Sequence, residues 1–189
     1  MREISLHILD AVQNSIEADA NKIYIKIRED YNQDKLIIKI EDNGKGMTPE
    51  FLKDVLDPFK TTRKTRHVGL GLPLFSAAAK NCSGDFKIDS KKGEGTKITA
   101  TFQHSHIDRA PLGDMVGTIL AILCSDKELD LYYNHQVNNK KFEFNTQEIK
   151  KILGNISLVN INVIKWLESY LKNNFKELYK NGGVLIAKN

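Results

Sequence analysis

Cysteine is scarce in this sequence of 189 residues, and no apolar run is long. The two cysteines, Cys82 and Cys124, have no CxxC spacing, which argues against a cysteine-based zinc or iron–sulfur site and favours two small buried thiols. No apolar run approaches the ~18 residues that a membrane helix needs, and the first residues form a polar, helix-like segment rather than a signal peptide. We therefore expect a cytoplasmic protein without a membrane segment.

The sequence also has no large excess of positive over negative charge. The sequence has 28 basic and 24 acidic residues, which are largely interspersed and give a net charge of +4. This pattern favours a solvated mixed surface over a basic patch, so we do not expect nucleic acid as a partner. The composition is that of a soluble globular protein, and the length allows one large domain with or without a smaller appendage.

The hydrophobic periodicity of the first half predicts an α+β fold. The predicted elements are a helix over 2–18, strands over 22–28 and 35–41, a short helix from Thr48-Pro49 to Leu56, a helix over 70–81, and a hairpin of strands 85–90 and 96–103. The simplest arrangement of these elements is an antiparallel or mixed sheet with helices on one face.

A different pattern begins after residue 102. It predicts an apolar helix over 111–124 that starts at Pro111, a hairpin around 134–139, a short helix after the capping box Asn145-x-x-Glu148, and an amphipathic helix over 160–180. We divide the chain into a domain over 1–105 and a smaller C-terminal α/β appendage, a helix–hairpin–helix extension over 106–189. The extension either binds a partner or caps the sheet.

Four short motifs follow one another in the first half. They are Asp10-x-x-x-Asn14 on a helix, Asp42-Asn43-Gly44-Lys45-Gly46 after a strand, Gly69-Leu70-Gly71-Leu72 at a helix start, and Gly93-x-Gly95-Thr96 before a strand. One such motif is weak evidence, but four in this order on suitable elements are strong evidence. Together they resemble the ATP-binding fold shared by gyrase, a heat-shock chaperone, sensor histidine kinases and mismatch-repair ATPases, the GHKL superfamily. The resemblance covers about 1–103 and implies a Bergerat-type two-layer sandwich.

The second motif predicts the adenine site. Adenine offers an exocyclic amine, and a carboxylate at a strand end, such as Asp42, is a suitable acceptor. Gly44 and Gly46 allow a sharp turn and a close approach to the ligand, and Met47 can pack against the base. By itself the motif is equally consistent with an ordinary Asn-Gly turn. Thr96 either bonds on the adenine side or merely begins a strand.

The first helix predicts the metal and catalytic groups. By the resemblance, Asn14 helps to hold Mg²⁺, and a neutral oxygen ligand suits this hard ion. Asp10 lies one turn earlier on the same side, where hydrolysing relatives have glutamate and common sensor kinases have asparagine. Aspartate here can act as a base, or it can be a solvated helix residue. Glu17 is a weaker substitute.

The third motif and the segment before it predict the phosphate site. A helix that begins at Gly69, Leu70, Gly71 and Leu72 presents free N–H groups to an anion. The preceding segment resembles the lid over the triphosphate, and its candidate contacts are Lys60, Thr61, Thr62 and Arg63. The alternative for this basic run is a solvated loop.

The resemblance implies a histidine kinase-like protein that binds ATP and Mg²⁺ and acts in signal transduction. The segment from Asn14 to Ala20 is similar to mismatch-repair ATPases, and the later motifs are similar to sensor kinases. The ATP domain begins at residue 2, so we expect no phosphoacceptor module before it. Our first hypothesis is an ATPase or protein kinase that acts on a partner protein in trans. The alternatives are an ATP-driven switch that forms a homodimer, and a non-catalytic nucleotide sensor.

The histidines are weaker candidates. For His104-x-His106 we favour surface or packing roles over a metal site, since no third ligand is evident. For His7 we favour a packed or hydrogen-bonded side chain over a phosphoacceptor.

Overall fold

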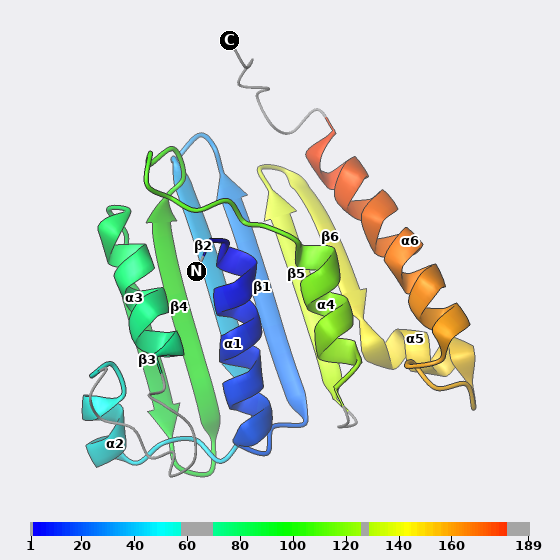
Figure 1. Ribbon diagram of the computed structural model, residues 1–189, viewed down its shortest axis with the longest axis horizontal. Coiled ribbons are helices and arrows are strands. Elements are labelled where there is room, and N and C mark those ends of the chain that lie inside the picture. The colour runs from blue at the N-terminus through cyan, green and yellow to red at the C-terminus, as the bar shows by residue number, and fades with distance from the viewer. Residues whose placement is uncertain (1, 58–69, 126–128, 181–189) are drawn as a thin grey trace.

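In the computed structural model, residues 2–57, 70–125 and 129–180 are described, and they form one mixed six-stranded sheet with helices packed on one face (Figure 1). The strand order is β3-β4-β2-β1-β5-β6. The elements of the first half are α1 (Ile4–Glu17), β1 (Lys22–Asp30), β2 (Lys35–Asp42), α2 (Pro49–Asp54), α3 (Gly71–Asn81), β3 (Phe86–Lys91) and β4 (Gly95–Gln103). Those of the second half are α4 (Met115–Leu123), β5 (Asp130–Val137), β6 (Lys140–Asn145), α5 (Thr146–Leu153) and α6 (Ile161–Tyr179).

Strict alternation along the strands decides which face the helices cover. In β1, Ile23, Ile25 and Ile27 are fully buried, whereas the residues between them are exposed. Because successive side chains of a strand point to opposite faces, each strand contributes one apolar row to the core and one polar row to the other face. Figure 1 shows α1, α3 and α4 in front of the sheet, on the side of the apolar rows. The predicted α+β sandwich is confirmed.

The C-terminal region joins the sheet of the first half through β5, which pairs in parallel with β1. A parallel neighbour needs a crossover connection, and α4 provides it while packing against α1. The buried apolar residues of both halves form one continuous cluster. The described part of the C-terminal region is therefore attached to β1 from Lys22 to Glu29.

The apolar helix of the second half starts later than the sequence predicts. Pro111 does not begin it; α4 begins at Met115, and the Asp114 side chain accepts a hydrogen bond from the Gly117 N–H at 2.8 Å. The carbonyls of Pro111 and Leu112 instead accept the Ile4 and Ser5 N–H groups at 3.0 and 2.7 Å. These N–H groups at the start of α1 have no partner within their own helix, which explains why the segment stays extended.

The predicted loop of the second hairpin is also too long. β5 continues to Val137, and Asn138 and Asn139 alone connect it to β6. Asn138 has a φ of 49°, a left-handed conformation that asparagine tolerates better than most residues. Its side-chain oxygen accepts the Tyr31 N–H at 3.0 Å, which fixes the turn against the end of β1. The asparagine-rich sequence is therefore mostly strand.

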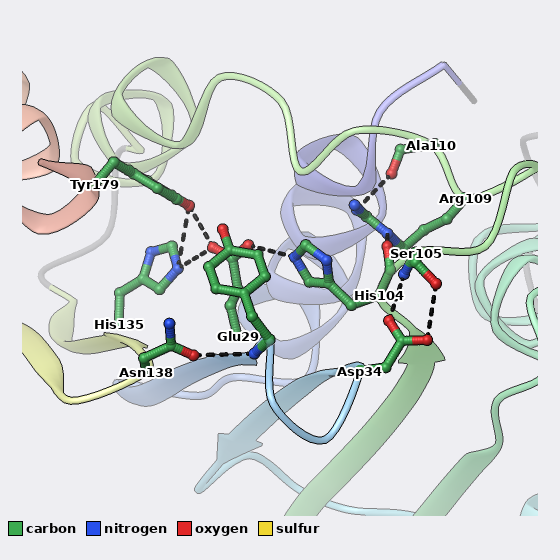
Figure 2. Close-up of polar contacts among 10 residues, drawn as sticks. Glu29, Asp34, His104, Ser105, Arg109, Ala110, His135, Asn138 and Tyr179 are labelled. Atoms are coloured by element: carbon green, nitrogen blue, oxygen red, sulfur yellow. Dashed lines mark hydrogen bonds and ion pairs between the residues drawn. The ribbon is translucent and has the colours of Figure 1, made fainter. Parts of the chain in front are cut away.

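A buried carboxylate joins the two halves at the far end of β1, where Figure 2 shows Glu29 surrounded by side chains from three other segments. His104, which follows β4, and His135 in β5 each place Nε2 2.9 Å from a Glu29 oxygen. The Tyr179 hydroxyl, from the end of α6, donates to the same carboxylate. Burial alone would raise the pKa of Glu29, but these hydrogen bonds together lower it well below its ordinary value.

Candidate functional site

The carboxylate of Asp42 is the centre of the candidate site, and it lies at the C-terminal end of β2, only 8% exposed. Oδ1 accepts the N–H groups of Gly44 and Thr96 at 2.8 and 3.2 Å, and Oδ2 accepts the Ser15 hydroxyl at 2.7 Å. An ionised carboxylate has about four acceptor positions, so the donors within 2–57, 70–125 and 129–180 leave one position on Oδ2 for a further donor. The three donors fix the orientation of the carboxylate before any ligand arrives.

Ser15 was not among the predicted site residues. It lies next to Asn14 on α1 and is buried, at 4% exposure, within the otherwise apolar stripe of that helix. A buried hydroxyl needs a hydrogen-bond partner. A serine within an apolar stripe was therefore the feature of the sequence that could have indicated a role for Ser15. The structure supplies that partner across 27 residues of chain.

Two glycines with positive φ bring the loops of the site together. Gly46 has a φ of 61°, and a Cβ atom there would lie 2.0 Å from the Lys91 carbonyl oxygen. Gly95 has a φ of 101°, and a Cβ atom would lie 2.0 Å from the Asp42 carbonyl oxygen. Only glycine permits both the backbone angle and the close approach. The loop after β2 is therefore fixed against the β3–β4 turn.

A second serine links the same loops. The Ser90 hydroxyl accepts the Met47 N–H at 3.0 Å and donates to the Gly95 carbonyl at 2.9 Å. It also lies 2.9 Å from the Thr96 hydroxyl. Thr96 is thus both an early residue of β4 and, through its N–H, a donor to Asp42. Met47 is half-buried and packs against the core.

Asp10 lies directly against the start of α3. A Cβ atom on Gly71, the first residue of that helix, would lie 1.5 Å from Oδ2 of Asp10. The glycine therefore gives the carboxylate room beside the positive end of the helix dipole. Asn14 lies one turn further along α1, half-buried like Asp10. The first and third motifs, 61 residues apart between Asp10 and Gly71, thus meet in space.

Of the remaining predicted site residues, some are described by the structure and the others are not. Leu72 is buried in the core, Leu70 is 43% exposed, and the Gly44 N–H donates to Asp42 as given above. A Cβ atom on Gly44 would lie 2.7 Å from the Ala18 carbonyl oxygen, so this loop also approaches the end of α1 closely. The candidate lid contacts and the first glycine of the third motif lie outside the described residues; they are Lys60, Thr61, Thr62, Arg63 and Gly69.

An open cleft of about 380 Å³ adjoins this end of the sheet. Asp42, Ser90, Gly95 and Thr96 line it together with Leu52 of α2. The rest of the lining is charged, with both signs present, from Glu41, Asp89, Lys91, Glu94 and Lys97. The site therefore opens to solvent between α2 and the ends of β3 and β4.

The histidines among the described residues are packed or hydrogen-bonded. His104 bonds to Glu29 and lies edge-on against Tyr31, with ring centroids 4.5 Å apart. His7 is buried and stacks on Phe75 of α3 at 5.0 Å. Burial lowers the pKa of His7 to about 4, because the charged form cannot be solvated there.

None of the described helices is long and apolar enough to cross a membrane.

Comparison with known proteins defines the class. Residues 2–106, more than half of the chain, match the family described as histidine kinase-, DNA gyrase B-, and HSP90-like ATPase. The chain belongs to this family, and the GHKL resemblance of its motifs is confirmed.

Many of the proteins that are similar to this chain carry the names of kinases. The chain is 34% identical to sporulation kinase E of Bacillus subtilis over 53% of its length, and 33% identical to the histidine-protein kinase AtoS of Escherichia coli over 49%. These matches span only 13% and 15% of the two relatives. A solved N-terminal domain of a DNA repair protein superposes over 84% of this chain and 59% of that one, with a TM-score of 0.55 and 15% identity. This last likeness concerns the fold alone.

Proposed function

We propose that this protein binds Mg-ATP between α1, the end of β2 and the start of α3, and uses it as an ATPase or protein kinase that acts on a partner protein in trans. The observation that carries the proposal is the Asp42 carboxylate, which three donors orient and which retains one acceptor position. The exocyclic amine of adenine is a donor of the required kind. A buried, pre-oriented acceptor also discriminates against a base that lacks the amine, since its remaining lone pair would stay unsatisfied.

The α1–α3 contact supports the phosphate end of the proposed site. Asn14 and Asp10 offer an amide oxygen and a carboxylate on one side of α1, and hard oxygen ligands of this kind suit Mg²⁺. We assign Asn14 to the ion, which would neutralise phosphate charge when bound. We assign Asp10 as the base that accepts a proton from the attacking water or partner hydroxyl.

The trans arrangement is supported by the relatives and by the extent of the match. Several relatives carry kinase names, and the match covers only a small part of each, so their names support a phosphoryl-transfer role for the shared domain and leave the acceptor open. A partner protein would supply the acceptor for this chain. The C-terminal region over 106–189, attached along β1, is the proposed partner-binding part.

The test is calorimetric titration of Mg-ATP into the wild type, Asp42→Asn and Glu143→Gln. Asp42→Asn replaces an acceptor oxygen by an amide donor, so we expect affinity to fall by about tenfold or more. Glu143 is an exposed carboxylate on β6 that does not line the cleft beside Asp42, so Glu143→Gln controls for the loss of one charge. Equal affinity of all three proteins would refute the adenine site.

Phosphate release from the same samples then separates the candidate reactions. Release without a partner, together with ATP-dependent dimerisation in light scattering, would favour the switch that forms a homodimer. Transfer of labelled phosphate only to a protein in lysate would support the trans kinase. Binding without release or transfer under either condition would leave the nucleotide sensor.

A further inference from the structure

The face of the sheet that points away from the helices carries an excess of positive charge. It is built from the exposed residues that alternate with the apolar rows, and most of its cations lie on β1 and β2 at its centre. Four of them, Lys22, Lys26, Lys35 and Lys39, have no ion-pair partner within 4 Å in the part of the chain that the structure describes. Charges that are interspersed along the sequence are thus sorted by the strands onto one surface.

The acidic residues of this open face form their ion pairs with other lysines, although Asp130, opposite Lys22, also interacts with that lysine electrostatically. Glu41 lies 3.9 Å from Lys97, and Asp89 lies 3.1 Å from Lys87. In the C-terminal strands, Glu143 pairs with Lys141 at 2.7 Å and Asp130 with Lys150 at 3.1 Å. The centre of the face therefore keeps its positive charge.

Two of the unpaired lysines are direct neighbours across the sheet. Lys26 in β1 is opposite Lys39 in β2, and the next positions in the same row are the uncharged Asn134 and Thr99. Like charges directly opposite each other in a sheet destabilise it. A bound anion that bridges the two ammonium groups would remove this repulsion.

An aromatic pair lies beside these lysines on the same face. Tyr24 and Tyr132 are opposite each other in β1 and β5, and Tyr24 is two residues from Lys26. Their rings stack with centroids 4.5 Å apart and an interplanar angle of 14°, and Tyr24 is 37% exposed. A large aromatic stack on a solvated sheet face provides a surface on which a further flat ring can stack.

We propose that this open face binds single-stranded nucleic acid. Lys26 and Lys39 contact the phosphates, and bases stack on the Tyr24–Tyr132 pair. Cations that follow a backbone beside aromatic rings are the combination that single strands recognise, because their bases are free to stack. The major groove of a duplex admits an α-helix or a two-stranded ribbon, and a six-stranded sheet is wider than either, so duplex is disfavoured. The cleft beside Asp42 is not lined by Lys26, Lys39 or the tyrosine pair, so the proposed surface and the proposed ATP site use different residues.

Fluorescence anisotropy with labelled oligothymidylate and oligouridylate of ~20 nucleotides tests this proposal. We expect the wild type to bind at about 50 mM salt and to weaken steeply at about 200 mM, because each phosphate contact releases counterions. Lys26→Glu with Lys39→Glu should weaken binding by about tenfold or more, and Tyr24→Leu with Tyr132→Leu by about fivefold or more without a change in charge. The relative affinities of the two oligonucleotides show whether DNA or RNA is preferred.

The matched control is Lys151→Glu with Lys165→Glu, which makes the same charge change at exposed positions on α5 and α6. It should retain most of the affinity, and Mg-ATP titration should be the same for all variants. Absent binding at low salt, or an equal loss in the control, would overturn the proposal. Tight binding of polyglutamate that the tyrosine changes leave untouched would also overturn it, in favour of an acidic protein segment.

Discussion

At the scale of single residues, the site depends on contacts between motifs that are far apart in the sequence. Asp42 is oriented by Ser15 on α1 and by Thr96 on β4, and Asp10 on α1 fits beside Gly71 on α3. Ser15 donates its hydroxyl, Thr96 donates its backbone N–H, and Gly71 leaves room because it has no side chain. Substitution of these neighbours should therefore change function more than stability.

Gly71→Ala tests the contact with Asp10. The added Cβ would lie 1.5 Å from Oδ2 of Asp10, and the carboxylate, as the end of a flexible side chain, would have to rotate away. If Asp10 is the base, as we propose, we expect ATP turnover to fall by about tenfold or more, because displacing a catalytic group by about 1 Å is costly, while the melting temperature changes little. Turnover is measured by phosphate release, or by phosphoryl transfer once a partner is known.

Non-additivity provides the control for this prediction. If Gly71→Ala acts through Asp10, it should have little further effect in the Asp10→Ala background. Full additivity of the two changes would mean that the glycine is needed for another reason, such as close approach of a phosphate.

At the scale of elements, α6 is held to the sheet by an apolar stripe and by polar contacts near its C-terminal end. Val163, Leu167, Leu171 and Leu178 are buried, whereas Ile161, in the first turn, is 64% exposed. Near the other end of the helix, Tyr179 donates to the buried Glu29 carboxylate. Burial raises the pKa of Tyr179, and the Glu29 charge raises it further, so the hydroxyl stays protonated and donates at any ordinary pH.

Tyr179→Phe should therefore loosen the end of α6. The change removes one of the donors to a buried carboxylate, and hydrogen bonds to charged groups contribute about 1.5–3 kcal/mol. We expect a loss of roughly this size in urea unfolding, with faster hydrogen exchange in α6. Tyr170→Phe on the same helix is the control, since its hydroxyl has no hydrogen bond to the described residues. Equal losses for both variants would contradict the role of Glu29.

At the scale of the whole molecule, two buried groups predict how stability depends on pH. His7 has an ordinary pKa of 6.5, and burial lowers it to about 4 in the folded protein. Between these values the unfolded chain binds more protons than the folded one, so stability falls as pH falls from 6.5 to about 4. Glu29 has its pKa held below its ordinary 4.5, so its contribution is present above that value and is lost only in stronger acid.

The measurement is urea unfolding as a function of pH for the wild type, His7→Phe and His106→Phe. Phenylalanine can keep the stack on Phe75 but cannot bind a proton. His7→Phe should therefore reduce the dependence of the unfolding free energy on pH between pH 6.5 and about 4. The expected difference is on the order of 2 kcal/mol near pH 5, at 1.36 kcal/mol per pH unit. His106→Phe, outside the α1–α3 interface, should leave the slope unchanged. An unaltered slope in His7→Phe would show that other groups set the acid limit.

The elements with strong periodicity could be predicted from the sequence, and those set by long-range contacts could not. Alternating isoleucines give β1 and β2 within two residues of their observed ends. The predicted start of α4 at Pro111 was wrong because the Pro111 and Leu112 carbonyls accept hydrogen bonds from Ile4 and Ser5 of α1. In each pair the two residues are 107 positions apart in the sequence. The second hairpin loop was too long because asparagine-rich sequence suggests a loop, whereas the pairing of β5 with β1 keeps it in the sheet.

The sequence by itself determined the class of this protein, since four motifs in order specify the histidine kinase-like ATPase fold, and it named Asp42, Asp10 and Asn14 as the groups to examine. Only the tertiary structure decided that Ser15 orients Asp42, that Gly71 makes room for Asp10, and that Glu29 joins the two halves. It also decided that interspersed lysines gather on one face of the sheet. The physical reason is that motifs and periodicity are local, whereas hydrogen-bond partners and the distribution of charge depend on which distant segments pack together.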